Sequence, residues 1–98
     1  MNDKLKSASM DDLFRSILTL KDIDECYAFF EDVCTINELL SLAQRMEVAR
    51  MLAAGKTYIE ICELTGASTA TVSRVNRSLN YGCDGYKLVL KRLEDGCV

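Results

Sequence analysis

Hydrophobic positions recur at helical spacing along most of the chain, and no stretch alternates as a half-buried strand would. Three of these stretches begin with a capping residue followed three positions later by an acid: Ser9 with Asp12, Asp22 with Glu25, and Thr35 with Glu38. The pattern predicts helices over residues 9–19, 22–33 and 36–54, with residues 1–8 as a flexible polar arm. An all-α fold is therefore expected.

The helix predicted over residues 36–54 is apolar around most of its circumference. Its apolar positions are Leu39, Leu40, Leu42, Ala43, Met46, Val48, Ala49, Met51 and Leu52. A helix of this kind is buried on all sides, and a chain of 98 residues has few elements to surround it. We expect a second copy to do so, which makes residues 9–54 the core of a homodimer. The alternative is a central helix wrapped by its own neighbours.

The stretch 57–79 predicts two short helices joined by a tight turn. Thr57 and Glu60 can form a capping box at the first helix, and Gly66 suits the left-handed position after its last turn. Ser68 can cap the second helix. Apolar residues fall where the two helices would cross, and these are Ile61, Ala67, Val72 and Val75. The spacing is that of a helix-turn-helix.

The second of these helices has a small, polar outer face. The candidate DNA-binding residues on that face and at its leading end are Ser68, Thr69, Ala70, Ser73, Arg74 and Arg77. Short side chains allow a helix to enter a major groove, and arginine reaches phosphate or guanine. No acid lies between Gly66 and Cys83. The alternative is that the two helices only pack together, as such pairs do in many all-helical proteins.

Residues 82–98 begin with a glycine-rich turn, after which Tyr86, Leu88, Val89, Leu90 and Leu93 predict a short C-terminal helix. Residues 9–98 would then form one helical domain. The net charge is −3, which is unusual for a DNA-binding protein. The acidic excess lies within residues 1–54, however, whereas Lys56, Arg74 and Arg77 outnumber the two acids of residues 55–81. This distribution is compatible with specific DNA binding and predicts weak non-specific binding.

Catalytic and metal-binding chemistry is not indicated by the composition. The chain has no histidine, and its five cysteines form no CxxC pair, so neither a zinc site nor a general base is evident. We predict no enzyme, no metal and no cofactor. Reduced thiols, the absence of a signal peptide and the absence of an apolar run of about 18 residues predict a cytoplasmic protein outside the membrane. Cys83 and Cys97 adjoin glycines and are expected to be exposed, with a redox role as an alternative.

The segment TGASTATVSRVNRSLNYG (residues 65–82) resembles the DNA-reading head of the tryptophan repressor family. The preceding segment FFEDVCTINELLSLAQRMEVARMLAAGKTYIEI (residues 29–61) is similar to the YerC/YecD group of that superfamily. The resemblance covers roughly residues 10–86. It implies a TrpR-like intertwined helical dimer with one helix-turn-helix per subunit, acting as a transcriptional regulator on double-stranded DNA with an inverted repeat.

The resemblance also implies a candidate effector pocket, which would comprise Thr35, Arg45, Arg74, Val75 and Ser78. The polar positions match those that hold the corepressor in the tryptophan repressor, but Val75 stands where that family has glycine. Overpacking of this kind costs on the order of 1–3 kcal/mol, so tryptophan is not the expected effector. Without the resemblance, Arg45 would be assigned to a surface ion pair with Glu38 or Glu47.

Three functions remain open at this point. The first is a homodimeric sequence-specific regulator, expected to be a repressor. The second is a regulator that responds to a small molecule other than tryptophan. The third is a helical protein-interaction module whose helix-turn-helix no longer binds DNA. A steep loss of affinity with salt would separate the first two from the third.

Overall fold

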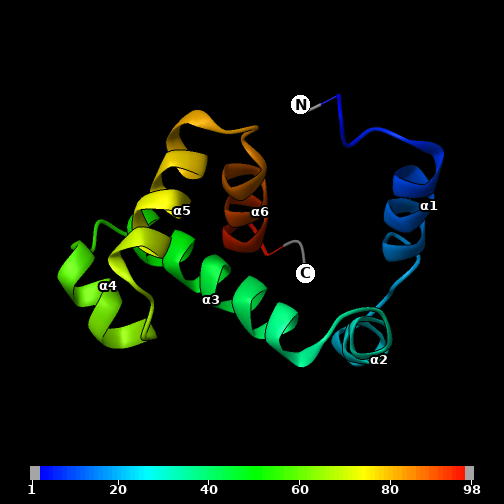
Figure 1. Cartoon of the computed structure of the whole chain (residues 1–98), viewed down its shortest axis with the longest axis horizontal. Helices are drawn as coiled ribbons and strands as arrows, with labels where there is room; N and C mark the ends of the chain where they lie inside the picture. Colours follow the sequence, from blue (N-terminus) through cyan, green and yellow to red (C-terminus); the bar gives the residue numbers. More distant parts are fainter. Residues whose placement is uncertain (1–2, 97–98) are drawn as a thin grey trace. The chain divides into compact units, whose positions relative to one another are not determined.

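Six α-helices and no strand make up the part of the chain that the computed structural model describes, residues 3–96 (Figure 1). They are α1 (Ala8–Ile17), α2 (Ile23–Val33), α3 (Ile36–Ala53), α4 (Tyr58–Thr65), α5 (Thr69–Tyr81) and α6 (Gly85–Glu94). The all-α prediction is confirmed. The chain divides into two compact units, of which unit 1 ends at Leu39 and unit 2 begins at Leu40.

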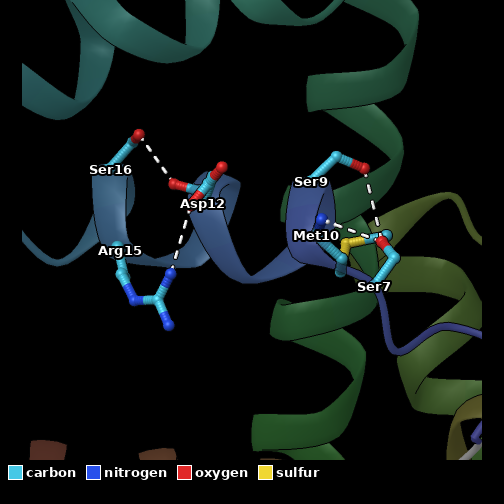
Figure 2. A network of polar contacts seen from close by, with 6 residues as sticks. All are labelled: Ser7, Ser9, Met10, Asp12, Arg15 and Ser16. Carbon is cyan, nitrogen blue, oxygen red and sulfur yellow. Dashed lines mark hydrogen bonds and ion pairs between the residues drawn. The ribbon is translucent and has the colours of Figure 1, made fainter.

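Helix α1 begins earlier than predicted. The hydroxyl of Ser7 caps it by accepting a hydrogen bond from the backbone N–H of Met10 at 3.1 Å (Figure 2). Ser9 lies inside the helix, where its hydroxyl is 3.3 Å from that of Ser7. The assignment of the helix start to Ser9 was therefore wrong. Ser7 has the extended backbone that an N-cap requires, with φ −161° and ψ 163°, and capping from there adds helical residues at the N-terminus.

The side chains of α1 and α2 are exposed or half-buried. Arg15 pairs with Asp12 at 3.1 Å on the exposed side of α1 (Figure 2). The carboxylate of Asp22 caps α2 by accepting from the N–H of Glu25 at 2.8 Å, as the sequence predicts. Neither α1 nor α2 contains a buried residue. Phe14 and Tyr27 are both more than half exposed.

A capping box starts α3, as predicted. Thr35 Oγ1 accepts from the N–H of Glu38 at 3.1 Å, and the Glu38 carboxylate accepts from the N–H of Thr35 at 2.8 Å. The hydrogen bond from the Thr35 backbone N–H to the Glu38 carboxylate, followed by hydrogen bonding from the Thr35 side chain, holds the pKa of Glu38 below its ordinary value. The helix ends with Gly55 in the left-handed region at φ 84°, and the N–H of Lys56 donates to the carbonyl of Met51 at 3.1 Å.

Unit 2 contains the core. Its fully or almost fully buried side chains are Val48, Ala49, Ile61, Ala67, Val72, Val75 and Leu79. Half-buried Met51, Leu52, Cys62 and Tyr86 pack against them. Helix α5 contacts α4 and α6 (Figure 1). The four residues predicted to lie between the two helices of the helix-turn-helix are all among the buried ones, so that prediction is confirmed.

The turn between α5 and α6 requires glycine at position 82, because a Cβ there would collide with the backbone carbonyl of Ser78. The predicted C-terminal helix is confirmed as α6. Within residues 3–96, no helix is long and apolar enough to span a membrane, and no cluster of three potential metal ligands is found. The cysteines described are free thiols, with Cys83 exposed as expected. Cys97 lies outside the described residues.

Candidate nucleic-acid interface

The helix-turn-helix forms from the signals that the sequence contains. Thr57 Oγ1 accepts from the N–H of Glu60 at 3.2 Å, and the Glu60 carboxylate accepts from the N–H of Thr57 at 3.2 Å. Helix α4 ends at Gly66, whose φ of 74° places it in the left-handed region and whose N–H donates to the carbonyl of Cys62 at 2.9 Å. The predicted capping box and turn glycine are both confirmed. They fix where α4 begins and ends.

Two residues that sequence reasoning missed hold the turn itself. The hydroxyl of Thr65 donates to the carbonyl of Ile61 at 2.7 Å and accepts from the N–H of Ala67 at 3.1 Å. The side-chain amide of Gln44 in α3 donates to the carbonyl of Thr65 at 3.3 Å. A threonine directly before a turn glycine is a local signal that could have been used. Gln44 is 21 residues away, and no local signal points to it.

Ser68 starts α5, the candidate recognition helix. Its hydroxyl oxygen accepts from the N–H of Thr71 at 3.1 Å and lies 3.1 Å from the hydroxyl of Thr71. The predicted cap is confirmed. Because the Ser68 hydroxyl is used to cap the helix, a direct contact from Ser68 to DNA remains a prediction.

The remaining candidate residues share the side of α5 that faces away from the core. Thr69, Ala70, Ser73, Arg74 and Arg77 are all exposed. On the opposite side, Val72, Val75 and Leu79 are buried. One face of the helix is therefore anchored while the other is free for contact. No ion pair engages either arginine among the residues described, so both guanidinium charges are available to phosphate or a base edge.

The residues of the candidate effector pocket have different surroundings. Arg74 and Ser78 are exposed on α5, whereas Val75 is 1% exposed and belongs to the core cluster of unit 2. Arg45 is exposed and donates to the hydroxyl of Ser41 at 3.0 Å, and this hydrogen bond stands in place of the surface ion pair with Glu38 or Glu47 that was the alternative assignment. Thr35 belongs to unit 1 and the other four to unit 2. The pocket stays a prediction.

Comparison with known proteins agrees with this architecture. The sequence profile of the Trp repressor protein family matches residues 8–94. The chain is 61% identical over 93 residues to YerC of Bacillus subtilis (strain 168). The aligned region covers 95% of this chain and 89% of that protein.

Two solved structures are close in both sequence and fold. A TrpR-like protein from Eubacterium eligens ATCC 27750 superposes with a TM-score of 0.92 at 66% identity, covering 95% of this chain and 96% of its own. A putative Trp repressor from Staphylococcus aureus superposes with a TM-score of 0.91 at 52% identity, covering 94% and 92%. The chain therefore belongs to the Trp repressor family of regulatory DNA-binding proteins, and within it to the YerC-related group.

Proposed function

We propose that the protein is a homodimeric, sequence-specific repressor of transcription that binds an inverted repeat in double-stranded DNA. The observation that supports this most is the exposed face of α5, which presents small polar residues and two arginines without ion-pair partners. The buried opposite face of α5 holds it against unit 2. Membership of a family of DNA-binding regulators supports the same function.

The homodimer is supported by apolar surface that a single chain leaves uncovered. Leu40 and Leu42 of α3 remain 63% and 47% exposed, and Ile36 is 75% exposed. Within one chain, neighbouring helices bury Val48 and Ala49 near the C-terminal end of α3. They leave Ile36, Leu40 and Leu42 uncovered. Surfaces of this kind on a soluble chain mark sites of protein association. A second copy is the simplest partner, and two-fold symmetry matches an inverted repeat.

Recognition is expected to involve two classes of contact. Thr69, Ala70 and Ser73, near the leading end of α5, would lie at base edges, partly through water because these side chains are short. Arg77 lies one turn further along and would contact a phosphate. The half-sites of the dimer would be about 34 Å apart, one helical turn of DNA.

The test is selection of bound sequences from a random DNA pool, followed by affinity measurements at several salt concentrations. We expect a dyad-symmetric site and a steep loss of affinity as salt rises.

Arg77→Ala should weaken all sequences alike and lower the salt slope by roughly one unit. Arg74→Ala should cost more on the selected site. Arg92→Ala on α6 is the matched control, and it should leave both properties unchanged. Salt-independent binding or sites without a dyad would contradict the proposal.

We propose further that tryptophan is not the effector. The side chain of Val75 is buried in the same cluster as Val48 of α3 and Ile61 of α4, which supports a recognition helix held in place without a ligand. Titration calorimetry with millimolar tryptophan should show no heat of binding, and tryptophan should not change DNA affinity. Val75→Gly should weaken DNA binding in the absence of any ligand. Micromolar tryptophan binding by the unaltered protein would show the argument to be mistaken.

A further inference from the structure

A pocket outside the proposed DNA-binding face lies entirely within unit 2. It has a volume of about 450 Å³ and is formed by the end of α3, the C-terminal half of α5 and one side of α6. It is a largely open groove, and its volume lies in the range of small-molecule sites. None of the residues assigned to DNA contact or to the candidate effector pocket lines it. The pocket therefore has no role in the function proposed above.

The floor of the pocket is apolar. Leu79 is buried, and Leu52 and Leu90 are half-buried at its wall. These side chains come from three different helices, so the floor is defined by the packing of unit 2 and not by one flexible segment. Such a surface favours an aliphatic group over water, and the preference grows with each methylene that is buried.

The rim has donors suited to an anion. Lys87 and Lys91 lie one turn apart on α6, and Asn76 and Asn80 lie one turn apart on α5. The side-chain N–H₂ of Asn80 donates to both the carbonyl and the side-chain oxygen of Asn76, each at 2.9 Å, which fixes the two amides relative to each other. In that arrangement, the N–H₂ group of Asn76 remains a donor without a partner among residues 3–96.

The two lysines are not equivalent. Lys91 forms an ion pair with Asp95 at 3.5 Å, whereas no ion pair engages Lys87 within the described chain. Glu94 is the one acid on the lining. Lys87 and Glu94 are therefore the lining charges without an ion-pair partner among the described residues, and Lys87 shares the lining with the amide donor of Asn76.

We propose that this pocket binds a small carboxylate with a short aliphatic tail. The carboxylate would accept from Lys87 and from the side-chain amide of Asn76, and the tail would cover Leu79 and Leu90. The carboxylate can belong to a simple aliphatic acid or to an aliphatic amino acid. Glu94 distinguishes these two sources, because an α-ammonium group would pair with its carboxylate and a simple acid has no such group.

The test follows the side-chain amide signals of Asn76 and Asn80 by NMR while sodium 4-methylpentanoate is added to the intact protein. We expect saturable shifts of both signals. Acetate, which lacks the tail, should bind at least about tenfold more weakly. Leucine binding more tightly than 4-methylpentanoate, with the difference removed in Glu94→Gln, would assign the ligand to the amino acids. The reverse order would assign it to simple acids.

Variants locate the binding site. Lys87→Gln should raise the dissociation constant about tenfold, as expected for loss of a charged hydrogen-bond donor. Arg92→Gln, on the same helix but outside the lining, should leave it unchanged. Asn76→Asp keeps the acceptor for Asn80 and replaces the donor by a negative charge, so binding should be lost while the melting temperature is retained.

Three results would overturn the proposal. The first is that neither side-chain amide signal shifts when millimolar 4-methylpentanoate is added in up to a 20-fold excess over the protein. The second is an equal response of the Lys87→Gln and Arg92→Gln proteins. The third is a change of oligomeric state in Asn76→Asp, because that would show that a second copy of the chain covers the pocket. None of these readouts requires DNA, so they are independent of the proposed repressor function.

Discussion

The two units of this chain are built from similar helices but differ in what they bury. Unit 2 places side chains from α3, α4 and α5 in one core, where Val48, Ile61 and Val72 are completely buried. In unit 1, by contrast, α1 and α2 contain no buried residue, although their faces carry phenylalanine, isoleucine and tyrosine. Burial of apolar surface is the dominant favourable term in folding. Unit 2 can therefore hold its helices together by its own contacts. Unit 1 buries too little apolar surface to hold its helices in the same way.

This difference matches a division of labour. The helix-turn-helix has to present α5 in a fixed geometry, and the core of unit 2 together with the Gln44–Thr65 hydrogen bond provides that. The uncovered apolar positions of unit 1 and of early α3 are available for association. The same kind of substitution should therefore have different effects in unit 2 around the helix-turn-helix and on the uncovered apolar surface of unit 1 and early α3.

The largest difference is expected from a charge placed on exposed leucines. Leu42 in α3 is 47% exposed, and Leu64 in α4 is 62% exposed in the single chain. Leu42→Asp should abolish the proposed dimer and with it most of the folded population, because the carboxylate would be buried against the partner. Leu64→Asp is the control and should remain dimeric with a stability within about 0.5 kcal/mol of the parent. Sedimentation and circular dichroism measure both properties.

A stable, folded, wild-type monomer at micromolar concentration would remove the basis for this prediction. So would an equal loss of structure in the Leu42→Asp and Leu64→Asp proteins, because the effect would then not be specific to the face of α3 assigned to the dimer.

A second comparison lies within α4. Ile61 is completely buried, whereas Ile59, two positions earlier in α4, is 73% exposed. Ile61→Ala should lower the free energy of unfolding by about 2–5 kcal/mol, since it removes buried methyl groups and leaves a cavity. Ile59→Ala should change it by no more than about 0.5 kcal/mol. Urea denaturation at a fixed protein concentration tests the pair. A large loss for Ile59→Ala would show that this face of α4 is covered in the assembled protein.

How much of the fold and of the candidate site could be predicted depends on how far apart along the sequence the interacting residues lie. Thr57, Gly66 and Ser68 act within four residues of their own positions, and all three were predicted. The start of α1 was misplaced because Ser7 and Ser9 both offer a capping hydroxyl and only the backbone distinguishes them. Helix periodicity identified Val72 and Val75 as buried. The Gln44–Thr65 bond and the pocket rim join residues far apart in the chain, so no local pattern predicted them.

A smaller effect is expected from the capping serines. Ser68 caps α5 in unit 2, and Ser7 caps α1 in unit 1. Ser68→Ala should lower the free energy of unfolding by about 1 kcal/mol, because the start of α5 is coupled to the core. Ser7→Ala should increase amide exchange in α1 with little effect on global unfolding, because α1 holds no buried residue. Hydrogen exchange and urea denaturation together measure this contrast. Equal global losses would show that α1 is as strongly coupled as α5.

The smallest effect concerns the start of α3. The Glu38 carboxylate accepts a hydrogen bond from the backbone N–H of Thr35, and both this bond and the one from the Thr35 side chain lower its pKa. A carboxylate whose pKa is lower in the folded state stabilises that state when it is ionised. Its contribution is therefore present above the pKa of the unfolded chain and is lost as the pH falls through the lowered folded value. Glu38 is fully solvent-exposed, so the effect is confined to fraying of the first turn of α3. NMR titration should give a lower pKa for Glu38 in the folded protein than in urea. The protection of the Glu38 and Leu39 amides against exchange, corrected for the intrinsic pH dependence of exchange, should fall on acidification. In Glu38→Gln, whose side-chain oxygen still accepts from Thr35 but does not titrate, this loss of protection should disappear. Its persistence there would assign the acid sensitivity to another group.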